Sequence, residues 1–438
     1  MLANSFICAT SLLTVLPAVA VHAQDEAANA ELSETDALHP DGNKRSSHET
    51  DRLDPIGVDL SAHYVSETAW NYRGGRKRDV TETGEFGIGV RLDMQRLAGT
   101  NGIFQATITR RRGPQLDDRA GLGTLQEVQE IYGRGRSWRL TQFWYEQRFL
   151  DGRVALKAGR TAPSEDFAAF SCTFQNLSFC GSQPGNIVTD YWYNWPVSQW
   201  GARLRIERNG AYAQVGAYEE NPRNLDGGIG FGHLKGATGV LVPIEFGLSH
   251  SGRQGGPVGT AKLGGWISTA NAPDVFFDKD RRPAVLTGAS PLERPSAYGV
   301  WLNVQQQVSG RSKDGQSVSG VSLFLNLLQA DRRTSAIDNQ VVAGFFAMDI
   351  LPELADDMIG FGLARTHVND RVAHAATIAG KAVPGAEYTA ELFYGFRPLN
   401  WLELRPNLQW IRRPGGLRGA RDIGVVGLKA ALRFQDFH

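Results

Sequence analysis

Apolar and polar residues alternate strictly over many segments of this chain, and this pattern constrains the fold more than any other feature. Successive side chains of a β-strand point to opposite faces, so a period of two predicts a strand. Each segment then has one apolar, often aromatic face and one face rich in Arg, Lys, Glu, Gln, Asn and Gly. Clear examples are residues 86–94, 200–207, 321–327, 388–397 and 426–434.

A soluble β-sandwich also alternates, but three further features favour a membrane barrel. First, some fourteen to sixteen such segments follow one another, separated by short turns (150–153) and by long irregular stretches (220–237 and 270–296), as in outer-membrane barrels. Second, the polar face is unusually charged. Third, the chain ends on an alternating strand with an aromatic residue, for which Phe434 and Phe437 are the two candidates. Charged residues on the polar face include Arg203, Arg205, Arg397, Lys429 and Arg433.

The bilayer itself requires closure, because no water there can satisfy unpaired backbone groups. An even number of strands is therefore expected, and we predict sixteen. Barrels of ~16–18 strands leave an aqueous channel, so this size implies conduction. The expected fold class is an all-β, transmembrane antiparallel β-barrel.

Composition excludes two other classes. Lys plus Arg and Asp plus Glu are both 46, so the chain lacks the basic excess expected of a nucleic-acid binder. No uninterrupted apolar run reaches the ~18 residues of a membrane helix, which excludes a helical membrane protein.

The N-terminus predicts export. Residues 6–20 form a short apolar core, and Ala23 ends a stretch of small residues suited to cleavage. We expect a signal peptide at 1–23, a polar, flexible segment at 24–53 and the barrel at 54–438, located in the outer membrane of a Gram-negative bacterium.

Cleavage leaves two cysteines, Cys172 and Cys180. In an exported chain an isolated pair eight positions apart predicts one local disulfide, which would stiffen a loop. A metal site is the weaker alternative, because no nearby His completes a zinc set.

The segment 172–224 resembles the carbohydrate-selective porin family of OprB type. The matching pieces are 174–177 between the cysteines, 196–201 at the start of a strand and 216–222 at the end of the next one; 424–434 fits the last strand of the family. The resemblance implies a sixteen-stranded barrel that lets monosaccharides such as glucose diffuse through a constriction of charged and aromatic residues. It also implies a monomer rather than a trimer.

Facing direction suggests which residues form that constriction. Arg203 and Arg205 oppose the apolar face of their strand, and Arg at the bilayer midplane costs ~2–4 kcal/mol, so both are expected in the lumen. Tyr218 lies on the polar face of the following strand, and Asn176 belongs to the matched piece between the cysteines. The expected constriction set is Arg203, Arg205, Trp192, Trp195, Tyr218 and Asn176.

The aromatic stretch 191–195, which contains Trp192 and Trp195, has two interpretations. It is either a sugar-stacking platform on a loop folded into the pore or part of the aromatic girdle at the membrane interface. The second interpretation is the preferred one.

The expected function is passive diffusion of small sugars, with sugars in transit and outer-membrane lipids as partners. A general or anion-preferring porin is the main alternative; a barrel enzyme with Ser and His at one rim and a soluble carbohydrate-binding β-protein are two others. The sequence contains no H-E-x-x-H, no G-x-S-x-G and no Gly-rich phosphate loop, so we expect no catalytic residues and no cofactor.

Overall fold

The structure is a computed structural model that describes residues 57–229, 235–250, 256–313, 316–351 and 357–435. The expected signal peptide (1–23) and polar segment (24–53) lie outside these residues, as do the side chain of Phe434 and all of Phe437.

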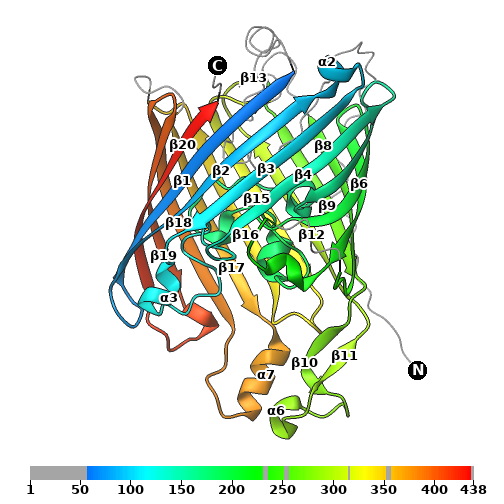
Figure 1. The fold of residues 1–438 in the computed structure, drawn as a ribbon. Helices are drawn as coiled ribbons and strands as arrows, with labels where there is room; N and C mark the ends of the chain where they lie inside the picture. Colours follow the sequence, from blue (N-terminus) through cyan, green and yellow to red (C-terminus); the bar gives the residue numbers. More distant parts are fainter. Residues whose placement is uncertain (1–56, 230–234, 251–255, 314–315, 352–356, 436–438) are drawn as a thin grey trace, which may run out of the picture. The chain divides into compact units, whose positions relative to one another are not determined.

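Sixteen antiparallel strands form a closed barrel, as predicted, and β1 pairs with β20 to complete it (Figure 1). The barrel strands, in order, are β1 (Val58–Arg73), β2 (Val80–Asp93), β3 (Gly102–Arg112), β4 (Trp138–Phe149), β5 (Val154–Thr161), β6 (Gln199–Arg208), β7 (Ala211–Glu220), β8 (Gly239–His250), β9 (Gly259–Ser268), β12 (Ala297–Gln307), β15 (Gly320–Ala330), β16 (Ile337–Met348), β17 (Met358–Val368), β18 (Ala386–Leu399), β19 (Leu402–Arg412) and β20 (Ile423–Gln435). The prediction of a strand in this C-terminal region is confirmed by β20, whose side chains alternate between the two faces over residues 425–431.

The remaining elements lie in the connections between these strands. Two small hairpins are formed by β10 (Ala272–Asp278) with β11 (Pro291–Arg294) and by β13 (Ser312–Lys313) with β14 (Gln316–Ser317). The helices are α2 (Met94–Ala98), α3 (Leu116–Ala120), α4 (Pro163–Asp166), α5 (Gln183–Ile187), α6 (Ala284–Thr287) and α7 (Asp370–Ile378), with 3₁₀ turns η1 (Leu177–Phe179), η2 (Pro222–Leu225) and η4 (Pro414–Gly416). In the described part of the chain, none of these helices has the length and apolar character needed to span a bilayer.

The predicted alternation decides which face each side chain takes. In β6, Leu204 and Ile206 are 40% and 54% exposed on the outside, whereas Arg203 is buried on the inside. Exposed aromatic residues lie at both ends of the outer face. Those near the long loops are Trp70, Trp138, Tyr298, Tyr388 and Trp410; those near the short turns include Phe149 and Trp401. Two rings of aromatic residues around an apolar band are typical of a barrel in a membrane.

The long loops project from one end, and two of them are joined there by a buried carboxylate. Asp274 of β10 binds Arg294 of β11 at 2.7 Å and Arg371 of α7 at 2.6 Å. These elements lie together beyond the strand ends (Figure 1).

The loop between β5 and β6, residues 162–198, folds back inside the barrel and packs against the inner wall (Figure 1). Trp192 of this loop is fully buried, and its ring centroid lies 5.6 Å from those of both Trp266 and Trp301 in the wall. The wall makes room for these rings with glycine, because a Cβ on Gly264 would lie 2.1 Å from the Trp301 indole. A second cluster surrounds Phe174 and includes Phe179, Phe324, Phe346 and Phe393.

The tip of this loop is also held by a buried cation. Lys429 of β20 contacts Glu67 at 3.1 Å and Glu130 at 2.8 Å, and it donates to the backbone carbonyls of Cys172 and Phe174. Glu130 belongs to the loop between β3 and β4, residues 113–137, so one ammonium group joins two loops to the wall. The Lys429 side chain is only 1% exposed.

We expect Lys429→Met to weaken the fold strongly, because it leaves two buried carboxylates without their cation. Removing one partner from a buried pair typically costs ~3–5 kcal/mol. The measurement is the temperature at which the folded band disappears in heated gel samples. Lys77→Met is the control, because Lys77 is 58% exposed and its pair with Asp79 should contribute little. Equal unfolding temperatures for both variants would contradict the anchoring role.

The structure joins Cys172 and Cys180 by a disulfide in the same loop tip. We expect a Cys172→Ser/Cys180→Ser variant to fold as a barrel but to show noisier single-channel current, because the strands do not depend on the bond and the loop tip does. Reductant should have the same effect on the wild type and none on the variant. Free thiols in protein taken from outer membranes would end this idea.

Candidate functional site

A chain of alternating charges lies on the inner wall formed by β4, β5 and β6, beside the start of the inserted loop. Arg148 contacts Glu146 at 2.9 Å, and Glu146 contacts Arg203 at 2.5 Å. Arg203 also contacts Asp166 of α4 at 3.4 Å, and Asp166 contacts Lys157 of β5 at 3.2 Å. The loop is thus attached to the wall by charge as well as by apolar packing.

Glu165, next to Asp166, completes this attachment. It accepts hydrogen bonds from Gln142 of β4 at 2.8 Å and from the backbone N–H of Ala162 at 3.1 Å, and Lys157 lies 3.6 Å away. Burial raises the pKa of the Glu165 carboxyl above its ordinary value, and the charge of Lys157 opposes this effect. A buried carboxyl held by three partners is suited to fixing the loop.

Arg205 lies one step further along β6 and is more accessible than Arg203. Its guanidinium carbon lies 3.8 Å from the ring centre of Tyr212, and it binds Glu207 at 2.7 Å. The Arg205 side chain is 16% exposed, against 2% for Arg203. Of the two predicted arginines, Arg205 is therefore the more accessible from the lumen.

The aromatic stretch 191–195 lies in the inserted loop, so the interpretation as a membrane-interface girdle is wrong. Trp192 is fully buried against Trp266 and Trp301 of the wall, so its ring is not available to a solute. Trp195 is partly exposed, and its Nε1 donates to Glu85 at 2.8 Å. Glu85 in turn binds Arg111 at 2.5 Å.

Tyr218 and Asn176 face inward and are both fully buried. The Tyr218 hydroxyl donates to Asp166 at 3.2 Å. The Asn176 backbone N–H and its neighbour at Gln175 donate to Glu391 at 2.7 and 2.8 Å, and Asn176 Nδ2 donates to Gln409. These contacts hold the inserted loop, which leaves no polar atom of either side chain directed to open lumen.

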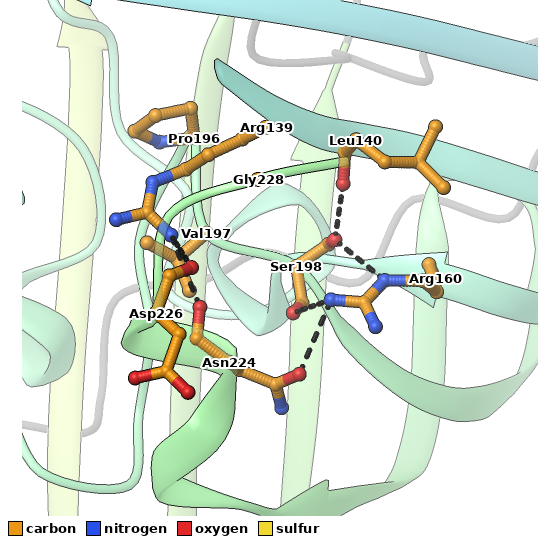
Figure 2. A pocket seen from close by; sticks show the side chains of 9 residues that line it. All are labelled: Arg139, Leu140, Arg160, Pro196, Val197, Ser198, Asn224, Asp226 and Gly228. Carbon is orange, nitrogen blue, oxygen red and sulfur yellow. Dashed lines mark hydrogen bonds between the residues drawn. The ribbon is translucent and has the colours of Figure 1, made fainter. Parts of the chain in front are cut away.

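The loop after β7 is tied to the end of the inserted loop by Arg160 and to β4 by Arg139 (Figure 2). Arg160 donates to the carbonyl of Ser198 at 2.8 Å and to Asn224 at 3.2 Å, and Arg139 donates to the carbonyls of Asn224 and Asp226. The cavity that these residues line measures about 10 Å³. This is room for about one water molecule, so the cavity is a structural joint and not a sugar site.

In the loop between β3 and β4, burial raises the pKa of Glu127 to about 8. Glu127 accepts from the backbone N–H of Gly133 at 3.0 Å, and its own carbonyl accepts from the backbone N–H of Leu177 in the inserted loop at 2.9 Å.

The alternative of a metal site at the cysteine pair is not supported. Glu130 lies near Cys172 and Cys180, but the disulfide occupies both sulfur atoms, which leaves no thiolate for a metal.

Sequence reasoning missed Glu146, Arg148 and Asp166. Glu146 and Arg148 lie on the polar face of β4, but three consecutive aromatic residues, 143–145, hide the alternation there, and the register shifts beside this strand. Asp166 lies in an irregular loop, where no periodic signal exists. Counting the alternation back from Phe149, at the C-terminal end of β4, would have placed Glu146 and Arg148 on the inner face.

Comparison with known proteins agrees with this architecture. The model of the family described as carbohydrate-selective porin, OprB family, matches residues 77–434. Porin B of Pseudomonas aeruginosa is 41% identical over 404 residues, which are 86% of this chain and 88% of Porin B. The putative porin QuiX of Acinetobacter baylyi is 32% identical over 88% of this chain and 91% of its own length.

Among solved structures, the high-pH structure of OprB from Pseudomonas putida superposes with a TM-score of 0.83 at 38% identity, covering 89% of this chain and 96% of that one. The family and these relatives are channels rather than enzymes. The match spans most of the chain, and the closed barrel is the fold that such channels have in the Gram-negative outer membrane. This chain therefore belongs to the OprB family of carbohydrate-selective porins.

Proposed function

We propose that this porin carries monosaccharides such as glucose passively through a lumen whose charges are paired. The observation that supports this proposal is that seven lumen cations lie within 4.0 Å of carboxylates, while three others, Arg139, Arg160 and Lys262, are held by backbone carbonyls. The paired cations are Arg111, Arg148, Lys157, Arg203, Arg205, Arg405 and Lys429.

Paired charges suit a neutral solute that is rich in hydroxyl groups. Guanidinium groups donate and carboxylates accept, so the wall can replace the water that a sugar loses, while the opposite charges cancel at a distance. A general or anion-preferring porin would instead need cations without nearby acids. The pairing therefore favours the sugar porin over this alternative.

Within the expected constriction set, we propose two kinds of role. Arg205 and Trp195 contact the sugar, because both side chains are partly exposed. Trp195 has a polar N–H and a flat ring, and Arg205 offers N–H donors beside the flat ring of Tyr212. Arg203, Trp192, Tyr218 and Asn176 position the inserted loop, since each is buried by partners in the loop or wall.

We further propose that the chain is exported with cleavage after Ala23, leaving the polar segment 24–53 ahead of the barrel, and that the protein works as a monomer. The apolar stretch 6–20 supports the first point, and the family resemblance supports the second. Mass determination of the mature protein and of its detergent complex tests both.

The deciding experiment is planar-bilayer conductance of the detergent-extracted protein with glucose titrated in. We expect discrete channels whose current falls saturably with glucose, because a weakly held sugar obstructs ions. Chloride and potassium should permeate similarly. Channels that strongly prefer chloride and ignore glucose would favour the anion-preferring alternative, and folded protein without channels would contradict a porin.

We expect Arg205→Gln to raise the glucose concentration for half-block about fivefold, as the loss of one hydrogen bond of ~1 kcal/mol predicts. Conductance without sugar should change little. Arg208→Gln is the control, because Arg208 is exposed at the end of the same strand. If both variants keep the wild-type half-block concentration, Arg205 does not contact the sugar.

A further inference from the structure

Outward-facing arginines gather around aromatic side chains at the long-loop end of β17, β18 and β19. Tyr388 of β18 is the Cα partner of Arg365 in β17 on one side and of Arg412 in β19 on the other. All three side chains alternate with buried neighbours, so they share the outer face of the barrel. Tyr388 is 40% exposed there.

Two further arginines lie over aromatic rings of the same region. The guanidinium carbon of Arg413 is 5.7 Å from the ring centre of Tyr388, and that of Arg73 is 4.9 Å from the ring centre of Trp410. Trp410 is itself an exposed residue of β19, and Gly424 of β20 is the Cα partner of both Trp410 and Arg73. We call Arg73, Arg365, Arg412 and Arg413, with Tyr388 and Trp410, the arginine patch.

The arginine patch has no carboxylate partner. Among the residues that the structure describes, no Asp or Glu forms an ion pair with any of its four guanidinium groups. Elsewhere on the same rim, two stacked arginines are paired, Arg112 with Glu82 at 3.1 Å and Arg333 with Asp331 at 2.8 Å, whereas Arg110 lies alone over Trp138 at 5.8 Å, without the neighbouring arginines of the patch. The patch therefore carries positive charge that none of the described carboxylates compensates.

The position of the arginine patch on the barrel indicates which kind of anion lies next to it in the membrane. Exposed Tyr and Trp mark the headgroup level of a membrane, and the long loops of such barrels lie on the extracellular side. Guanidinium groups bind phosphate oxygens bidentately and tolerate partial desolvation better than ammonium groups. We propose that the arginine patch binds the phosphate groups of a phosphorylated lipid headgroup in the outer leaflet.

This proposal concerns the outer surface and is independent of what passes through the lumen. It predicts that one stretch of the rim retains a lipid during purification, while the rest of the girdle contacts lipid without selecting it. Bound lipid would screen the repulsion among the four arginines, which come from β17, β19 and β1 and from the residue after β19, so that one strand separates each arginine-bearing strand from the next by ~9.6 Å.

The test is native mass spectrometry of the purified full-length protein, mixed with bisphosphorylated lipid A or with the same lipid after phosphatase treatment. We expect the wild type to bind the phosphorylated form and Arg365→Gln/Arg412→Gln to lose about thirtyfold in affinity. The matched control is Arg112→Gln/Arg333→Gln, which removes the same charge from acid-paired positions and should bind as the wild type does. Channel conductance and glucose response should be unchanged in both, which shows that both fold.

Equal affinity for the dephosphorylated lipid would overturn the proposal, as would equal losses in the two double variants, which would mean that overall charge and not this patch attracts the lipid. Full displacement of the lipid by millimolar inorganic phosphate would also overturn it, by assigning the patch to a small anion.

Discussion

Backbone N–H and C=O groups inside a bilayer have no water to bind, and every other feature of this protein depends on how they are satisfied. The sixteen strands satisfy them by pairing in sequence order and by closing β1 onto β20. A ring of this size cannot fill its interior with wall side chains alone. The fold therefore leaves a wide lumen, and the protein has to control what crosses it by other means.

Two loops fold inward and bind each other as well as the wall. Lys429 joins both loops to β20, and Glu391 binds consecutive backbone N–H groups at the disulfide tip. Apolar contacts of Trp192 and Phe174 with the wall bury side chains of the inserted loop that would otherwise be exposed to water. The two loops thus form a packed core inside the barrel, and many of their charged contacts hold them in place.

Charge has different uses on the two faces of the barrel. In the lumen, many cations lie beside carboxylates, which gives a wall of hydrogen-bond donors and acceptors. On the outer rim, Arg365 and Arg412 flank Tyr388 without acids, which suits an anionic surface layer. The formal net charge of the whole chain is zero and does not show this difference, because net charge is a sum over both faces.

The sequence alone determined which face most strand residues take, because a period of two leaves only two directions; β4 is the exception, since the aromatic run 143–145 hides its alternation. The sequence placed Leu204 outside and Arg203 and Arg205 inside, the repeated alternation indicated the barrel, and the resemblance of segment 172–224 indicated the family. It could not determine which inward residues a solute can reach. That depends on contacts such as Asn407 with Gln175 and Lys429 with Cys172, which are more than two hundred residues apart. Only the tertiary structure brings the loops onto the wall, and their packing buries Arg203 while leaving Arg205 accessible.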